Sequence, residues 1–310
     1  MNRRDFARAL AGLTAGLGFR PRALADLPTR RLGSTDLEIP ILSLGGSHVG
    51  HAGSEAAGRR LVEAAYDAGV RLFDTAESYQ AGTSERWIGL ALESVRRSVL
   101  LMSKTFAFPE RTRDSARRHL AGSLERLRTD YLDLWQLHSV RSVADVDRAF
   151  GSAGAMEYVL EAKTQGLVRY VGVTGHVLPA AQLRALHYWD RGIRFDAMQM
   201  PINPIDYHQR SFQREVLPEL VRRKIGVIAM KTSADGRLLR ERICTAAECL
   251  RYVWSLPVDV AVVGMERPGL VRENARLARE FQPMAREQLD ELRRRIARRA
   301  RLDLEWYKGG

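Results

Sequence analysis

The sequence Phe73-Asp74-Thr75-Ala76-Glu77-Ser78-Tyr79 is the first of three segments in which an apolar strand gives way to polar side chains. The other two are Leu101-Met102-Ser103-Lys104 and Leu134-Trp135-Gln136-Leu137-His138. Each apolar run is typical of a buried parallel strand. In a barrel of parallel strands, functional side chains are assembled at the carboxyl ends of the strands. The three segments therefore predict that Asp74, Tyr79, Lys104 and His138 meet at one rim of a barrel.

The alternation of strand-like and helix-like segments continues along the chain. We expect eight strands, near Ile41–Leu44, Arg71–Asp74, Val99–Lys104, Tyr131–His138, Val168–Val173, Phe195–Met200, Gly226–Ala229 and Val260–Val263. Helices are expected between them, near 54–68, 84–96, 111–128, 145–164, 179–190, 209–223 and 245–255, then from Pro268 and again over about 284–303. Eight such units predict an α/β fold, a parallel (β/α)8 TIM barrel, in one domain.

Two segments before the first predicted helix complete the pattern. Arg31-Leu32-Gly33-Ser34-Thr35-Asp36-Leu37-Glu38-Ile39-Pro40 reads as a hairpin, and Leu42-Ser43-Leu44-Gly45-Gly46 reads as a strand that ends in glycines. With these segments and the spacing of the four polar residues, the chain resembles an aldo-keto reductase from about Leu32 to Asn274. The resemblance implies hydride transfer between a nicotinamide cofactor and a small carbonyl compound or sugar.

The resemblance gives each of the four rim residues a role. Tyr79 would act as the general acid and base, because the carbonyl oxygen gains negative charge as hydride arrives. A free phenol has a pKa of about 10, so we expect Lys104 to lower the pKa of Tyr79. Asp74 would hold Lys104, and His138 would position the carbonyl.

The resemblance also implies a cofactor site at the same rim. Its expected residues are Gly45, Gly46, Asp74, Thr174, Gly175, Gln199, Met230, Lys231, Gly264, Arg267, Glu273 and Asn274. Gly175 stands where the family often has Asn, so Thr174 and Gln199 would contact the nicotinamide carboxamide. Met230 stands where many members stack a tyrosine on the nicotinamide; its polarizable thioether can cover a ring face.

The adenosine end of this site departs from the family pattern. Many members that prefer NADP have Lys at the position of Gly264 and Arg at the position of Leu270, and this chain has neither. Arg267 or Arg272 could pair with a 2′-phosphate, while Glu266 would oppose it. We therefore expect NADP as the cofactor, with NAD also possible and only a weak preference between them.

Composition excludes several other sites. The two cysteines, Cys244 and Cys249, lie five apart in one helical segment, off the same-face spacings of three and four. We expect buried structural residues rather than a disulfide, and no iron–sulfur cluster, which needs four ligands. The net charge of +12 comes largely from the first 25 residues and from a block over 286–301. No nucleic-acid module accompanies either block, so no nucleic-acid partner is expected.

The N-terminal sequence is typical of an export signal. Arg3 and Arg4 precede the apolar stretch from Ala9 to Phe19, and Ala23-Leu24-Ala25 gives an A-x-A cleavage site. Residues 1–25 are therefore predicted to be a twin-arginine signal peptide, read by the twin-arginine translocase and cleaved. Residues 26–310 would form the barrel domain, exported to the periplasm without a membrane anchor.

Two alternatives differ in class from an exported reductase. Some barrels of this family act as redox-sensing, nicotinamide-binding regulatory subunits with little turnover. A metal-dependent barrel hydrolase would need several histidines and carboxylates that converge on one ion. No metal site is predicted, because the histidines are scattered along the chain, at His48, His51, His119, His138, His176, His187 and His208.

Overall fold

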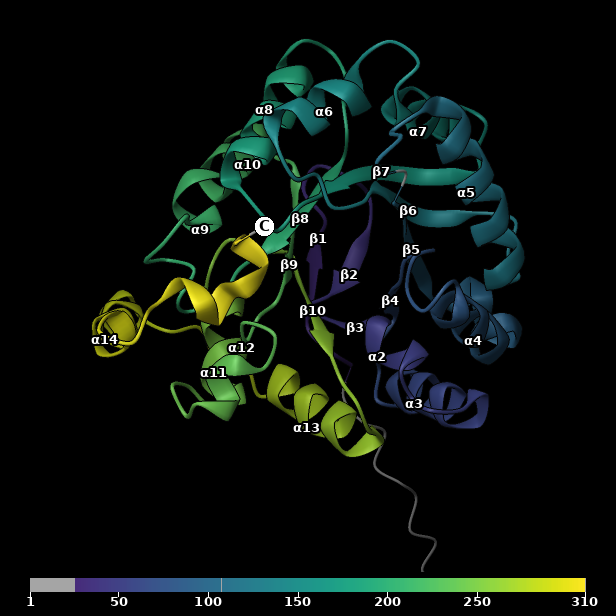
Figure 1. The fold of residues 1–310 in the computed structure, drawn as a ribbon. Helices are drawn as coiled ribbons and strands as arrows, with labels where there is room; N and C mark the ends of the chain where they lie inside the picture. The colour runs from purple at the N-terminus through teal and green to yellow at the C-terminus, as the bar shows by residue number, and fades with distance from the viewer. Residues whose placement is uncertain (1–25, 107, 310) are drawn as a thin grey trace, which may run out of the picture.

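The computed structural model of the chain describes residues 26–106 and 108–309 (Figure 1). The expected signal peptide, residues 1–25, lies outside this range. No helix in the described ranges is long and apolar enough to cross a membrane.

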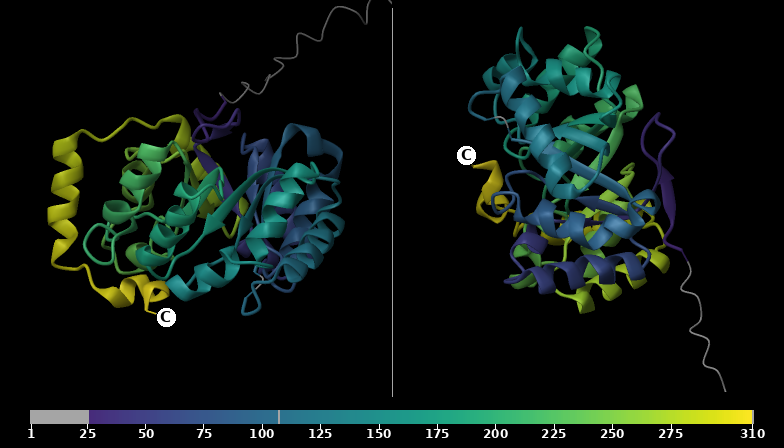
Figure 2. Two further views of the ribbon diagram at one scale, coloured as in Figure 1. Left: turned by 90° about the horizontal axis from the view of Figure 1, so that it is seen from above. Right: turned by 90° about the vertical axis from the view of Figure 1, so that its right-hand side faces the viewer.

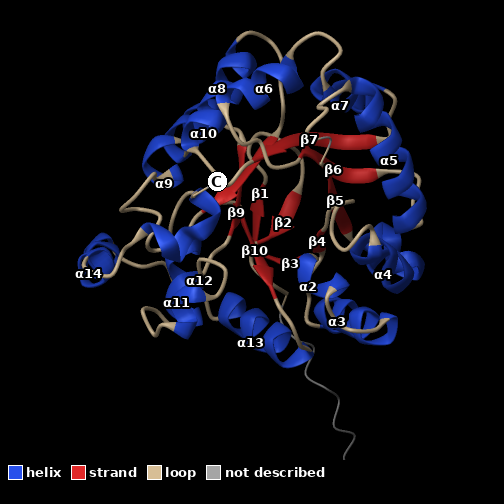
Figure 3. Cartoon of the chain, viewed as in Figure 1, coloured by secondary structure: helices blue, strands red, loops and turns tan. Residues whose placement is uncertain are grey.

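A closed barrel of eight parallel strands forms the centre of the molecule (Figure 3). Around the barrel its strands are β3 (Leu42–Gly45), β4 (Leu72–Asp74), β5 (Leu100–Thr105), β6 (Leu132–Leu137), β7 (Val168–Thr174), β8 (Ala197–Pro201), β9 (Gly226–Met230) and β10 (Val260–Gly264), which pairs again with β3. The prediction of a (β/α)8 barrel is confirmed. The register pairs Gly45 with Asp74, and Lys104 with Gln136, so residues near the carboxyl ends of neighbouring strands lie side by side.

Helices surround the barrel, as the views in Figure 2 show. They are α2 (Ser47–Gly50), α3 (Glu55–Asp67), α4 (Thr83–Leu92), η1 (Glu93–Ser98), α5 (Arg113–Leu127), α6 (Val143–Phe150), α7 (Ala155–Thr164), α8 (Pro179–Asp190), α9 (Phe212–Glu215), α10 (Leu217–Arg223), α11 (Arg237–Arg240), α12 (Ala246–Trp254), α13 (Pro268–Arg279), α14 (Arg286–Ala297) and η2 (Leu302–Lys308). The side chains of Ser54, Thr112 and Ser142 cap the N-termini of α3, α5 and α6 by accepting hydrogen bonds from backbone N–H groups of the first turn.

Two of the predicted helices are interrupted. The expected helix over 145–164 is two helices, α6 and α7, separated by Gly151 to Gly154. A Cβ atom at Gly154 would lie 2.4 Å from the carbonyl oxygen of Ala149, so only glycine allows this close return of the chain. The expected helix over 209–223 divides into α9 and α10 near Val216.

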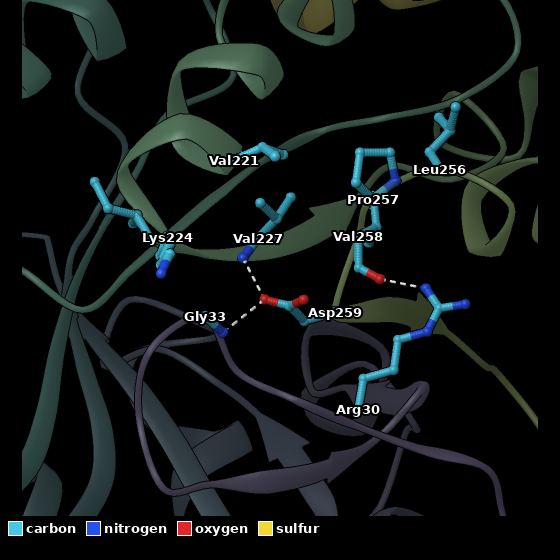
Figure 4. A pocket seen from close by; sticks show the side chains of 10 residues that line it. Arg30, Gly33, Val221, Lys224, Val227, Leu256, Pro257, Val258 and Asp259 are labelled. Carbon is cyan, nitrogen blue, oxygen red and sulfur yellow. Dashed lines mark hydrogen bonds between the residues drawn. The ribbon is translucent and has the colours of Figure 1, made fainter.

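A hairpin closes the amino-terminal end of the barrel. Its strands, β1 (Thr29–Arg31) and β2 (Glu38–Pro40), pair antiparallel, and Figure 4 shows how their connection is attached. The carboxylate of Asp259 accepts hydrogen bonds from the backbone N–H groups of Gly33 at 3.0 Å and Val227 at 2.8 Å. Arg30 donates to the carbonyl of Trp254 at 2.7 Å. The surface hollow of about 410 Å³ at this end therefore lies among groups that attach the hairpin.

The chain after α13 returns to the opposite end of the barrel, which the sequence did not indicate. The extra helix expected over about 284–303 is present as the shorter α14, and the 3-10 segment η2, which was not expected, follows it. The buried ammonium of Lys308 donates to Asp206 at 2.5 Å and to Glu305 at 2.6 Å. Since Asp206 follows β8, this ion cluster fixes the C-terminal segment beside the carboxyl ends of the strands.

The basic block over 286–301 attaches α14 to the barrel. Arg295 pairs with Glu248 at 2.6 Å, and Arg301 pairs with Glu241 at 2.8 Å. Arg293 donates to the hydroxyl of Tyr252 at 3.0 Å. A large part of this positive charge is thus used in intramolecular contacts.

Candidate active site

The structure brings together the four rim residues that the sequence singled out. Asp74 is the last residue of β4, Lys104 lies near the end of β5, and His138 directly follows β6. Tyr79 lies in the turn after β4, where its backbone N–H donates to the carbonyl of Ala76 at 3.0 Å. Because β4, β5 and β6 are consecutive in the barrel, their carboxyl ends place these side chains around one point.

Lys104 and Asp74 form a buried ion pair at the base of the site. The Lys104 ammonium donates to Asp74 Oδ1 at 2.5 Å and to the carbonyl of Thr75 at 2.8 Å, and both side chains are almost fully buried. Burial raises the pKa of Asp74, and the attraction of Lys104 opposes this rise. Asp74 and Tyr79 together raise the pKa of Lys104 in spite of its burial. The lysine is therefore held in its charged form.

The second oxygen of Asp74 belongs to a polar chain across the barrel interior. Gln199 Nε2 donates to Asp74 Oδ2 at 3.4 Å, and Gln136 Nε2 donates to Gln199 Oε1 at 2.9 Å. Gln136 Oε1 is buried and has no partner within the described part of the chain. These contacts fix the orientation of the Asp74 carboxylate and of the Gln199 amide.

Tyr79 lies next to the ammonium of Lys104, which is 5.1 Å from the centre of the phenol ring. Burial raises the pKa of Tyr79; the charge and hydrogen bond of Lys104 lower it, and Asp74 raises it further. Lys104 thus acts on this pKa in the expected direction, but burial outweighs it and the net direction is upward. At neutral pH the phenol therefore carries its proton.

His138 faces Tyr79 in an edge-on arrangement with 5.8 Å between the ring centres. Burial, and then the charge of Lys104, hold the pKa of His138 well below its ordinary value, so the imidazole is neutral. Arg111 donates to the His138 carbonyl at 2.8 Å and forms a buried pair with Asp145 at 2.8 Å. Arg111 is thus a positioning residue that the sequence analysis missed, because its partners lie about 30 residues away along the chain.

A cleft of about 300 Å³ connects Asp74 and Tyr79 with the loops after β3, β9 and β10; Lys104 and His138 are not among the residues that line it. The predicted site residues among those that line it are Gly45, Gly46, Asp74, Tyr79, Gln199, Met230, Lys231 and Gly264. A Cβ atom at Gly46 would lie 2.6 Å from the carbonyl oxygen of Asp74. A Cβ atom at Gly264 would lie 2.4 Å from the ring of His48. The cleft wall therefore depends on glycines, as a surface that a flat ligand approaches closely would.

Two predicted nicotinamide contacts are already used within the protein. Thr174 Oγ1 accepts a hydrogen bond from the backbone N–H of Ser139 at 2.9 Å. Gly175 is enclosed, because its Cβ atom would lie 2.9 Å from Val140, and Gln182 Nε2 donates to its carbonyl at 3.0 Å. No asparagine side chain fits at Gly175, so Gln199 remains the amide that faces the cleft.

The predicted adenosine-end residues lie around the start of α13. Arg267 is its N-cap residue and is exposed, and Glu273 is also exposed, whereas Asn274 is buried. None of these three is among the residues that line the cleft, which at this end reaches Glu266 and Leu270. Glu266 approaches His48 to 3.6 Å.

The loop after β9 adds a charged residue that the sequence analysis did not select. Asp235 lines the cleft and accepts a hydrogen bond from Lys231 at 2.9 Å. It also accepts one from the Trp306 indole at 3.2 Å. The C-terminal segment therefore contacts a wall of the cleft directly, a pairing across 71 residues that local patterns do not reveal.

Comparisons with known proteins agree with the fold and identify the family. The model of the aldo/keto reductase family matches residues 41–246. Methylglyoxal reductase YeaE of Escherichia coli is 31% identical over 213 residues, 67% of this chain and 69% of that protein. An aldo-keto reductase from Bacillus halodurans in its holo form superimposes with a TM-score of 0.73 at 22% identity, over 87% of this chain and 96% of that chain. An aldo/keto reductase from Klebsiella pneumoniae, in complex with NADP and acetate, gives 0.70 at 22% identity, over 87% and 95%.

We predict that His176, in the loop after β7, makes stability depend on pH. Burial, followed by the charges of Lys231 and Arg141, lowers the pKa of His176 to about 4, against about 6.5 in an unfolded chain. Its contribution to stability is present above about pH 6.5 and is lost as the pH falls toward about 4. The free energy of unfolding in urea should include a loss of about 2 kcal/mol from this residue between about pH 7 and pH 5.

His176→Gln should lack that loss, whereas His187→Gln, on the exposed side of α8, should retain it. An equal loss in His176→Gln and in the parent protein would contradict the assignment.

Proposed function

Because the chain belongs to the aldo/keto reductase family, we propose that it transfers hydride between a nicotinamide cofactor and the carbonyl carbon of a small aldehyde, ketone or sugar. The observation that carries the proposal is the meeting of Tyr79, which lines the cleft, with a charged lysine and a neutral histidine. The bound reduced nicotinamide supplies the hydride. The residues described above supply the proton, the positive charge and the orientation of the substrate.

Tyr79 donates its proton to the carbonyl oxygen as negative charge develops there. Its raised pKa keeps this proton available in the reductive direction. The adjacent Lys104 stabilises the phenolate that remains, and Asp74 holds the ammonium in place. The neutral imidazole of His138 donates a hydrogen bond to the same oxygen and orients the substrate. In the oxidative direction the phenolate takes the proton from the alcohol.

The cleft suits a dinucleotide cofactor that runs from the rim residues toward α13. Gln199 would bind the carboxamide of the nicotinamide, beside Thr174 and Gly175, and Met230 would cover its ring. Gly45, Gly46 and Lys231 would lie along the chain of the cofactor, with Gly264, Arg267, Glu273 and Asn274 at its adenosine end. NADP is the proposed cofactor; the NADP complex of the Klebsiella pneumoniae structure, with the same fold, supports this choice.

A metal-dependent reaction finds no support in the described ranges. No group of three or more histidine, cysteine, aspartate or glutamate side chains that could hold an ion occurs in residues 26–106 and 108–309.

We also propose that residues 1–25 export the enzyme and that residues 26–310 are the mature catalytic domain in the periplasm. The paired Arg3 and Arg4, the apolar stretch after them and the Ala23-Leu24-Ala25 sequence support this assignment. Export after folding suits a protein that would bind its nicotinamide in the cytoplasm.

Tyr79→Phe should bind the cofactor normally but lower kcat about 100-fold or more, the scale of a lost general acid. Lys104→Met should also lower kcat and move the basic limb of the pH–rate profile upward, because Lys104 lowers the pKa of Tyr79. Tyr66→Phe is the matched control, since the Tyr66 hydroxyl lies on the surface, where it hydrogen-bonds Ser98. Parental kcat in Tyr79→Phe, on an aldehyde that the parent protein reduces, would exclude this tyrosine as the acid. Turnover absent in the parent, with cofactor binding intact, would instead favour the regulatory subunit.

The preference for NADPH over NADH should be about tenfold or less, equivalent to about 1.4 kcal/mol. Glu266 lies at the adenosine end of the cleft and opposes a 2′-phosphate. Glu266→Gln should therefore bind NADPH more tightly with little change for NADH, and Glu280→Gln at the far end of α13 should change neither. Titrations of protein fluorescence with both reduced cofactors measure these affinities. A thousandfold preference in the parent would show that the phosphate binds elsewhere.

Export should depend on the paired arginines. In fractionated native cells, the parent chain should yield a periplasmic protein that begins near Asp26. Arg3→Lys combined with Arg4→Lys should leave precursor in the cytoplasm. Arg20→Lys combined with Arg22→Lys is a control that conserves charge outside the motif. Equal periplasmic amounts from the parent and the Arg3/Arg4 variant would contradict the twin-arginine route.

A further inference from the structure

The two cysteines are buried and free, as expected, but both lie at the start of α12. The expectation from their spacing placed Cys244 and Cys249 in one helix, on different faces. The helix instead begins at Ala246, with Thr245 as its N-cap residue in extended conformation. Cys244 therefore precedes the cap and Cys249 is the fourth helical residue. Side chains at these two positions commonly pack against each other across the first turn.

The cap of α12 fixes the direction from which Cys244 enters the helix. Thr245 Oγ1 accepts from the backbone N–H of Glu248 at 3.1 Å, and the Glu248 carboxylate accepts from the N–H of Thr245 at 2.8 Å. This reciprocal pair holds the backbone on both sides of Thr245. Both cysteine side chains are buried, and the two thiols are close enough to shift each other's pKa.

The two thiols differ in access and in charge environment. Cys244 lines a surface hollow of about 400 Å³ together with Glu248 and Arg295, whereas Cys249 is 1% exposed. The interaction with Cys249 and the nearby Arg295 guanidinium lower the pKa of Cys244, against the opposing effect of burial. The same interaction, with burial, raises the pKa of Cys249 well above its ordinary value. Cys244 is thus the more acidic of the two thiols and the one that lines the hollow, so an external reagent meets it first.

We propose that Cys244 and Cys249 are an oxidisable dithiol that forms an intramolecular disulfide with low-molecular-weight disulfides, Cys244 attacking first and Cys249 resolving. The Cys244 thiolate attacks one sulfur of oxidised glutathione and releases one glutathione thiolate. Cys249 then loses its proton, and its sulfur attacks Cys244 Sγ and expels the second glutathione. Two cysteine thiols are oxidised and one glutathione disulfide is reduced to two thiols, so atoms and electrons balance. The site contains none of the residues proposed for hydride transfer and goes beyond that function.

The test uses the full chain, reduced and then incubated with oxidised glutathione, alkylated with iodoacetamide and weighed intact. The expected product is a monomer that has lost two hydrogens and takes up no alkyl group. Cys249→Ala should retain one glutathione on Cys244, because the resolving sulfur is missing. Cys244→Ala should remain free of glutathione, because Cys249 is inaccessible.

Two alkylated cysteines, a disulfide-linked dimer, or glutathione on Cys249 of the Cys244→Ala variant would each overturn the proposal. Far-UV circular dichroism of each variant checks that it is folded; should a variant fail to fold, the mass of the parent chain decides alone. The readout does not involve catalysis, so failure of the proposed reductase function leaves this test intact.

Discussion

The buried ion pair between Lys104 and Asp74 is the interaction on which the rest of the site depends. Two charges removed from water are tolerated only when each finds well-placed partners. Closure of the barrel provides them, because it brings the ends of β4 and β5 together and adds the carbonyl of Thr75 and the amide of Gln199. The glycine at Gly46 follows from the same constraint, since any side chain there would meet the backbone of Asp74.

The environment of this pair also decides the protonation states around it. The charge of Lys104 lowers the pKa of both Tyr79 and His138, although burial dominates in each case. Burial acts in opposite directions on the two groups, because it favours the neutral form of each. The phenol keeps its proton and the imidazole stays uncharged. The site therefore combines one cation with two neutral rings. Its phenol can give up a proton to an oxygen, and the cation can stabilise the phenolate left behind.

Sequence patterns predicted the parts of this protein that are determined by neighbours along the chain. Continuous apolar runs gave all eight strands, and the polar residues at their ends gave the four that meet at the rim. Pairings between distant residues were missed, such as Arg111 with Asp145 and Lys308 with Asp206, because no local pattern records a partner 30 or 100 residues away. The cysteines are buried and free, as expected, but their relation to the helix was missed: α12 begins only at Ala246, so Cys244 and Cys249 lie on either side of its first turn.

The two ends of the barrel differ in how their charges are used. At the amino-terminal end, the Asp259 carboxylate accepts hydrogen bonds from backbone N–H groups and so holds the hairpin in place. At the carboxyl-terminal end, Lys308 anchors η2, and the neighbouring Trp306 contacts Asp235 of the cleft wall. A change in the C-terminal segment can therefore alter the cleft without touching the four rim residues. The chemistry rests on rigid strand ends, whereas the shape of the opening depends on a C-terminal segment held by Lys308 together with hydrogen bonds from Asn203 and Arg210.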